Sequence, residues 1–240
     1  MSKPEILKLT KSSGLPADVK EYCTSIVSCG LSSSLKTALR KNAVEVIRSL
    51  DGILTNGAGI LACSKEEVLF STGFNKNNKS PARFESALAE IRAVIFLDAE
   101  GFTGLHLIGT GAKKTADIRG TREGKDYVFE VCCIQTTGDL TSVAYLTDSS
   151  GAVRKFGKKP VDYLELKYDK KARQMKSSRK EYDCARGGLI FAVDPYNLSA
   201  FADKSRLMEL ARGLHERKNK PLNTHICILS GSDGCVFPGW

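Results

Sequence analysis

The pattern of apolar and polar positions first marks a helix over residues 80–101. Apolar residues recur there three, four and seven positions apart, which is the spacing of one buried helix face. The members of that face are Phe84, Ala87, Leu88, Ile91, Val94 and Ile95. Ser80 suits the N-cap, Pro81 the first helical position and Gly101 the C-terminus. We therefore expect a well-bounded helix that packs on a core.

Glu90 stands out within this helix because it lies at the border of the apolar face. A carboxylate among aliphatic neighbours is costly unless something compensates its charge. Glu85, in contrast, shares its side of the helix with the charged Arg92. A lone acid at such a border commonly packs its stem and keeps its head in water. Two further acids later in the chain favour a functional role for Glu90 instead.

Two short segments of strand character come after the helix, and each carries one acid. Asp117 lies in Ala-Asp-Ile, and Glu130 lies in Phe-Glu-Val within a predicted strand over residues 127–135. The polar stretch 120–126 suits the turn of a hairpin. Antiparallel strands can place both carboxylates side by side, where they either share a proton or bind a cation. Oxygen ligands favour hard ions, so we expect Mg²⁺ or Mn²⁺ at Asp117, Glu130 and Glu90.

Helices and strands are expected in the rest of the chain as well. In the N-terminal region, helices are predicted from Pro16 towards Gly30, through Leu35, Leu39, Val46 and Leu50, and from Ser64 to Phe70, with breaks at Gly57, Gly59 and Gly73. Further on, strands are predicted at 142–147, 152–156, 189–193 and 224–229, and helices at 162–186, ended by Gly187-Gly188, and at 199–217. A glycine-rich tail completes the chain. This order predicts an α/β three-layer core over residues 80–240, preceded by a mainly helical extension over residues 1–79.

The composition of the chain is typical of a globular protein with reduced cysteines. A chain of 240 residues with 42% hydrophobic content can form a sizeable core. No segment approaches the ~20 consecutive apolar residues of a membrane helix, and the N-terminus lacks the apolar run of a signal peptide. The eight cysteines are scattered without Cys-x-x-Cys pairs, so reduced thiols are expected. We expect a cytoplasmic protein with no membrane partner.

The net charge of +9 is concentrated in one part of the chain. Residues 154–180 hold eleven basic side chains against three acidic ones, an excess of eight. A charged stretch is often only a solvated helix face. Directly after three candidate metal ligands, it is better interpreted as a surface for a polyanion such as nucleic acid. Binding through phosphates would depend steeply on salt.

The order of these features resembles the PD-(D/E)XK nuclease superfamily, over about residues 80–195. That family has a helix with Ala-Glu, then Asp, then Glu-x-Lys at the end of a hairpin, a helix with Gln, and a buried strand. By position, Glu90 matches the helix glutamate, and Asp117 and Glu130 match the two acids that hold the metal. The resemblance implies a restriction-endonuclease-like core and a Mg²⁺-dependent endonuclease that hydrolyses phosphodiester bonds, with DNA favoured over RNA.

One position departs from the family pattern, because Cys132 stands where Glu-x-Lys has its lysine. That lysine helps to orient or deprotonate the attacking water and stabilises charge on the phosphate, which a cysteine cannot do. In the later helix Lys170 and Gln174 resemble the family's basic and glutamine positions. We expect Lys170 or Lys171 to supply the missing cation and Gln174 a hydrogen bond, with Lys113, Arg119 and Lys167 as other sources of the cation.

In the nuclease interpretation, the contacts to nucleic acid are assigned to Lys113, Lys114, Arg119, Lys167 and Arg173.

Two interpretations from other classes remain open. The missing lysine at Cys132 also suits a nuclease-fold protein that binds nucleic acid without cutting it. The other of the two is a protein-interaction subunit, with an acidic partner on the basic helix or a protein partner on residues 1–79. The oligomeric state is open, and a homodimer is among the assemblies considered.

Overall fold

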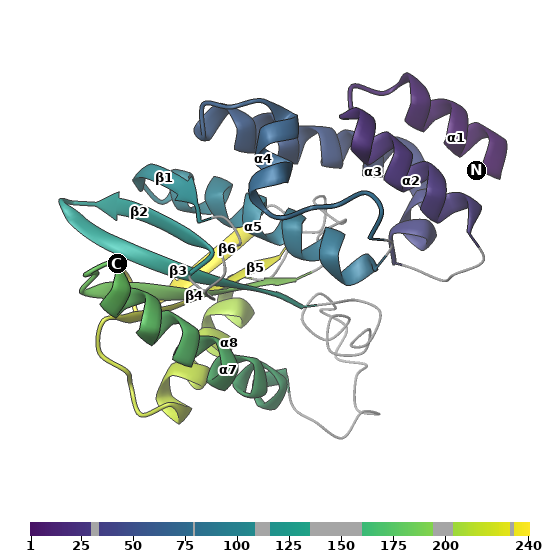
Figure 1. Ribbon diagram of the computed structural model, residues 1–240. Helices are drawn as coiled ribbons and strands as arrows, with labels where there is room; N and C mark the ends of the chain where they lie inside the picture. The colour runs from purple at the N-terminus through teal and green to yellow at the C-terminus, as the bar shows by residue number, and fades with distance from the viewer. Residues whose placement is uncertain (30–33, 79, 109–115, 135–159, 194–203, 231–232) are drawn as a thin grey trace.

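A mixed β-sheet lies at the centre of the molecule, with helices on both of its faces (Figure 1). The computed structural model describes residues 1–29, 34–78, 80–108, 116–134, 160–193, 204–230 and 233–240. Over these residues the sheet has six strands in the order β1-β2-β3-β4-β5-β6. Their bounds are β1 Thr103–Leu107, β2 Ile118–Arg122, β3 Lys125–Ile134, β4 Arg186–Val193, β5 Thr224–Ser230 and β6 Asp233–Phe237. The predicted α/β class with a mixed sheet flanked by helices is thereby confirmed.

The strand directions change within the sheet. β1, β2 and β3 pair antiparallel, β3, β4 and β5 pair parallel, and β6 pairs antiparallel with β5. Parallel neighbours need a crossover connection, and each connection here contains a helix. α7 (Pro160–Glu181) connects β3 to β4, and α8 (Lys204–Arg217) connects β4 to β5. β4 is buried along almost its whole length, as expected for a strand covered on both faces.

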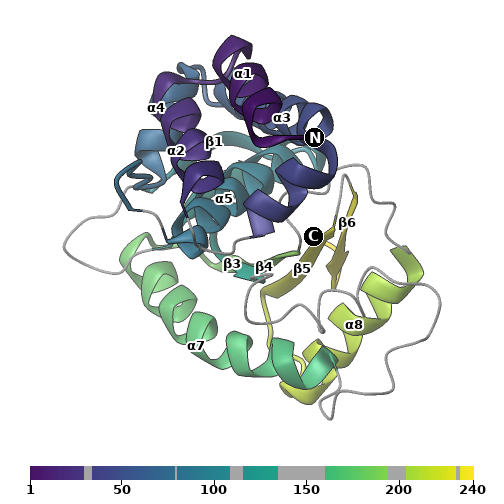
Figure 2. The same ribbon diagram turned by 90° about the vertical axis from the view of Figure 1, so that its right-hand side faces the viewer.

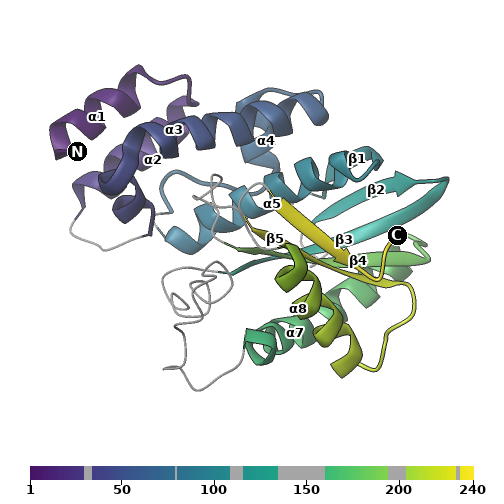
Figure 3. The same ribbon diagram turned by 180° about the vertical axis from the view of Figure 1, so that it is seen from behind.

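The helices form layers on the two sides of the sheet, which Figure 2 shows from its edge. α5 (Pro81–Ala99) covers one face, whereas α7 and α8 cover the other, with α8 beneath β5 and β6 (Figure 3). The N-terminal helices stack outside α5 and have the bounds α1 Lys3–Ser12, α2 Ala17–Ser28, α3 Ser34–Ile60 and α4 Lys65–Ser71. Phe84, Leu88 and Ile91 of α5 belong to the same hydrophobic core as these helices. In the part of the chain that the structure describes, no helix is long and apolar enough to cross a membrane.

α5 has the predicted ends but a different environment. Ser80 is its N-cap, it ends at Ala99, and Gly101 adopts φ +83° just beyond it. Glu85 and Arg92, which share one side of the helix by their spacing, are both buried, with exposed fractions of 0% and 5%. α5 is covered by the sheet on one side and by the N-terminal helices on the other, so it has no broad solvent face. Arg92 donates a hydrogen bond to the carbonyl of Val193 at the end of β4 (3.1 Å).

The hairpin turn is shorter than predicted. β2 extends to Arg122 and β3 begins at Lys125, so only Glu123 and Gly124 form the turn, with φ of +50° and +72°. Two turn residues with positive φ are typical of a tight β-hairpin, because the twist of such a turn matches the twist of the two strands. The other polar residues of stretch 120–126 are strand residues next to this turn, where Asp126 accepts hydrogen bonds from Arg119 and Thr121.

Gly187 and Gly188 do not end a helix, as the sequence suggested, but lie inside β4. α7 ends at Glu181, and the chain turns through Asp183 with φ +51°. Both glycines are required by close packing. A Cβ at Gly187 would lie 2.9 Å from Sδ of Met175 on α7, and one at Gly188 would lie 2.7 Å from the ring of Phe129 on β3.

Two further expectations differ from the structure, and others lie outside the described residues. α3 continues through Gly57 and Gly59 to Ile60, so these glycines do not interrupt it. The tail contains a strand, β6, because it pairs with the otherwise open edge of β5. The strands expected at 142–147 and 152–156 lie outside the described residues, as do residues 199–203 of the helix expected at 199–217.

The contact between α3 and α5 gives a test of this packing. A Cβ at Gly57 would lie 2.4 Å from Cγ2 of Ile91, whose branched side chain is fully buried, whereas one at Gly52 would meet no atom within 4 Å. Gly57→Ala should lower the free energy of unfolding by about 1–3 kcal/mol through overpacking. Gly52→Ala should raise it by about 0.4–1 kcal/mol. Urea unfolding measures both, and equal effects of the two variants would contradict the observed helix contact.

Candidate active site

Asp117 and Glu130 are brought together by the hairpin. Asp117 lies directly before β2, and its backbone N–H donates to the carbonyl of Phe129, the neighbour of Glu130 on β3 (2.9 Å). The Asp117 carboxylate in turn accepts a hydrogen bond from the backbone N–H of Val131, which lies 2.6 Å from Oδ2. These two bonds fix Asp117 beside the segment of β3 that carries Glu130.

Lys171 joins the two acids from the middle of α7. Its Nζ lies 3.2 Å from Oδ2 of Asp117 and 2.9 Å from Oε2 of Glu130. The side chain of Glu130 is fully buried, while those of Asp117 and Lys171 are 23% and 20% exposed. Lys170, the other lysine expected to supply the cation, is exposed. Since successive helical residues point about 100° apart, only one of two adjacent lysines can face the acids.

Glu90 reaches the same electrostatic environment from α5. Burial raises the pKa of its carboxyl well above the ordinary value, the charges of Asp117 and Glu130 raise it further, and Lys171 opposes this effect. Glu90, Asp117 and Glu130 are therefore close enough for their protonation states to depend on one another. The three predicted acids therefore interact electrostatically, from α5, from the residue directly before β2 and from β3.

Burial dominates the protonation of Glu130. It raises the pKa of this carboxyl to about 7, with Asp117 adding to the shift and Lys171 opposing it. For Lys171, burial alone would lower the pKa, but the charges of Asp117 and Glu130 outweigh it and raise the pKa above its usual range. Together with Glu90, these residues would carry three negative charges and one positive charge if all were ionised. The cluster therefore favours an additional proton or cation.

The donor atoms are compatible with a hard cation. Oε1 of Glu130 is buried and has no hydrogen-bond partner, which leaves one carboxylate oxygen available as a ligand. Among the described residues, however, no group of three or more His, Cys, Asp and Glu side chains lies close enough together to hold a metal ion. The Lys171 ammonium instead contacts the carboxylate oxygens that a cation would bridge.

Cys132 lies close to this cluster, on β3. Cys132 is half-buried, and burial raises the pKa of its thiol even though Lys171 and Lys167 act in the opposite direction. The thiol of Cys132 thus lies within the electrostatic influence of the Lys171 ammonium. Gln174 is half-buried one helical turn beyond Lys171 on α7.

The residues assigned to nucleic acid are distributed around the acids. Lys113 and Lys114 lie outside the described residues. Arg119 is held by Asp126 at 2.9 Å, and its guanidinium lies 5.9 Å from the ring centroid of Tyr182, just beyond α7. On α7, Lys167 is half-buried and Arg173, Lys170, Lys176 and Lys180 are exposed.

Two acidic residues of α7 are paired with basic residues outside this helix. Glu165 and Asp169 form ion pairs with Lys218 at 2.9 and 2.7 Å, and Glu165 also pairs with Arg217 at 3.3 Å. These partners come from the C-terminal end of α8 and the residue directly after it. The solvent side of α7 therefore remains positively charged.

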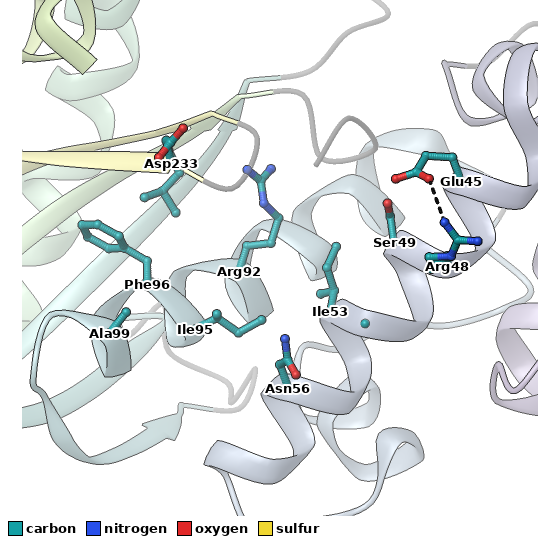
Figure 4. A pocket seen from close by; sticks show the side chains of 12 residues that line it. Glu45, Arg48, Ser49, Ile53, Asn56, Arg92, Ile95, Phe96, Ala99 and Asp233 are labelled. Carbon is teal, nitrogen blue, oxygen red and sulfur yellow. Dashed lines mark hydrogen bonds and ion pairs between the residues drawn. The ribbon is translucent and has the colours of Figure 1, made fainter. Parts of the chain in front are cut away.

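Sequence reasoning missed the backbone N–H of Val131, because a main-chain donor has no residue signature. It also missed a cavity of about 380 Å³ between α3, α5 and the β5–β6 edge (Figure 4). Ile53 of α3, Phe96 of α5 and Asp233 of β6 line it, so its walls come from three distant segments. None of the predicted site residues lies in this lining.

The raised pKa of Glu90 predicts the pH dependence of stability in metal-free buffer. The folded state keeps this proton to higher pH than the unfolded chain does, so the free energy of unfolding should fall as pH rises above about 5. Glu130 acts in the same direction between its ordinary value of 4.5 and about 7. Glu90→Gln should reduce this slope and stabilise the protein at pH 8 by about 1–3 kcal/mol.

Denaturant unfolding at pH 5 and pH 8 measures this effect. Glu66→Gln, at an exposed position of α4, is the matched control and should retain the wild-type slope. Identical slopes for wild type and Glu90→Gln would show that Glu90 is not part of the charged cluster.

Comparison with known proteins assigns no family to this arrangement. The chain matches no protein-family model, no curated protein and no solved structure. The function is therefore argued from the geometry of Glu90, Asp117, Glu130 and Lys171.

Proposed function

We propose that the protein is a metal-dependent nuclease that hydrolyses phosphodiester bonds of nucleic acid, with DNA favoured over RNA. The observation that carries this proposal is the convergence of Asp117 and Glu130 on the Lys171 ammonium, with Glu90 close enough to perturb their charges. The order α5, β2–β3 hairpin, α7, buried β4 also agrees with the order of elements in the PD-(D/E)XK family. This agreement supports a restriction-endonuclease-like core.

The acids have separate roles in this mechanism. Asp117 and Glu130 would hold Mg²⁺ or Mn²⁺, and the free Oε1 of Glu130 is one oxygen suited to that role. When bound, such a cation supplies polarisation of the phosphate and a lower pKa for the attacking water. Glu90 would orient that water or help to hold a second cation, since its carboxyl lies within the field of the other two.

Lys171 takes over the role of the motif lysine. In the family pattern that lysine comes after the glutamate on the same strand, where this chain has Cys132. Here the positive charge comes from α7 and still lies next to the glutamate, at 2.9 Å. A cation in this place can stabilise charge that develops on the phosphate. The replacement by Cys132 thus leaves the site with a positively charged group.

The exposed basic residues of α7 provide the surface for the substrate backbone. Lys170 directly precedes Lys171, and Arg173 and Lys176 lie further along the exposed side of the helix. Because Glu165 and Asp169 of α7 are paired with Arg217 and Lys218, these two acids compete less with phosphates for the basic residues of the helix. Arg119 and Lys167 would add contacts nearer to the acids.

Cleavage of plasmid and single-stranded DNA with Mg²⁺ or Mn²⁺ tests the assignment of the acids. Asp117→Asn and Glu130→Gln should each lower the cleavage rate by about 100-fold or more, because each removes a charged metal ligand. Asp126→Asn is the matched control on the exposed end of the same hairpin and should cut at nearly the wild-type rate. Cleavage that is indifferent to Asp117→Asn would overturn the assignment.

The role of Lys171 has its own test, because the chain offers the position that the family uses. Lys171→Met should lower the rate by about 100-fold or more through loss of the charge. Adding Cys132→Lys to Lys171→Met should restore part of the activity by returning an ammonium to the same cluster. Lys170→Met should mainly weaken substrate binding. If Lys171→Met cleaves like wild type, the cation must come from another residue.

A nucleic-acid-binding protein without catalysis is the alternative that one observation favours. Lys171 already satisfies an oxygen of each of the two acids, so the cluster can be stable as an ion pair without a metal. Such a protein would bind oligonucleotides in a salt-dependent way and show no metal-dependent turnover. A protein-interaction subunit would bind them weakly at physiological salt.

A further inference from the structure

The Lys171 ammonium occupies the place of a cation shared by Oδ2 of Asp117 and Oε2 of Glu130. It is within 3.2 Å of Oδ2 of Asp117 and 2.9 Å of Oε2 of Glu130, so it bridges carboxylates from two neighbouring segments of the sheet. Oδ2 of Asp117 also accepts the N–H of Val131, which leaves this oxygen with little capacity for another partner. An incoming divalent cation and this ammonium would repel each other if both occupied the same place.

Removing the ammonium without a replacement would be unfavourable. Glu130 is fully buried and its other oxygen has no hydrogen-bond partner, so without Lys171 its charge would be left without its nearest compensation. The free protein is therefore stabilised with Lys171 on the acids. Lysine, however, has a long flexible side chain with three donors, and it can turn to another anion when one is offered.

A phosphate group would be such an anion. Lys171 is 20% exposed, and Lys170 beside it is exposed on the same helix. Lys167 lies one turn earlier and acts electrostatically on Cys132, as Lys171 does. A nucleic-acid backbone attracted to these lysines would bring a phosphate to the ammonium of Lys171.

We propose that Lys171 blocks the metal site of the free protein, and that a nucleic-acid phosphate draws the ammonium away and thereby opens Asp117 and Glu130 to a divalent cation. This inference rests on the proposed function, since the proposed function assigns the divalent cation and the nucleic acid to one site. Metal and nucleic acid then bind cooperatively. Because the coupling between two ligands is reciprocal, each should tighten the binding of the other by the same factor.

Calorimetric titration with Ca²⁺ tests this coupling without relying on turnover. The full-length protein is titrated alone and with a saturating short DNA duplex, and gel electrophoresis verifies that the duplex remains intact. We expect the duplex to tighten Ca²⁺ binding by about 10-fold, within the usual range of such couplings. Titration of the duplex alone, and of Asp117→Asn with the duplex, accounts for Ca²⁺ bound to DNA.

Variants of Lys171 separate blocking from other effects. Lys171→Met should bind Ca²⁺ more tightly than wild type in the absence of DNA, and the duplex should add little. Lys171→Gln, which keeps hydrogen-bond donors to the acids, provides a second variant if Lys171→Met does not fold. Lys8→Met, at an exposed position of α1 away from the acids, is the control and should keep the difference between Ca²⁺ binding with and without duplex.

Two results would overturn the inference. One is Ca²⁺ binding by Lys171→Met and Lys171→Gln that is no tighter than that of wild type, and the other is wild-type binding that the duplex does not change. Failure of the proposed function is a separate result. Coupling without DNA cleavage by the Mg²⁺-loaded protein would retain the inference and reject the nuclease, whereas cleavage without coupling would do the reverse.

Discussion

The buried Glu130 carboxylate needs a compensating charge from elsewhere in the structure. It lies in the middle of β3 with no solvent exposure, where an uncompensated charge would cost several kcal/mol. Lys171 compensates it from α7, and Asp117 shares the same ammonium. This ion pair ties the α7 side of the sheet to the hairpin and holds two like charges next to each other. A protein that needed only a stable core would be served as well by apolar residues here.

The architecture places the remaining charges around that pair. The tight turn at Glu123 and Gly124 fixes the hairpin register, and the hydrogen bond from the amide of Val131 then holds the Asp117 carboxylate in place. α5 is packed between the sheet and the N-terminal helices, so Glu90 can approach the acids only from a largely buried helix. The N-terminal helices thus support the site indirectly, through the layer that carries Glu90.

Positive charge is divided between the interior and the surface of α7. Lys171 faces inward and compensates the acids, whereas Lys170 and Arg173 face solvent. Lys218, directly after α8, pairs with Glu165 and Asp169, so these two acids compete less for the basic surface. One helix therefore provides the counter-charge of the carboxylate cluster and a cationic surface next to it.

The sequence by itself determined the elements that depend on local patterns. Capping residues bounded α5, apolar runs marked β4 and β5, and segments of strand character marked the hairpin that carries Glu130. Only the tertiary structure decided which of two adjacent lysines meets the acids, because that depends on the rotation of α7 against the sheet. It also decided that Gly187 and Gly188 lie in a strand. The side chains of Met175 and Phe129, which come from other elements, leave no room for a Cβ at these two positions.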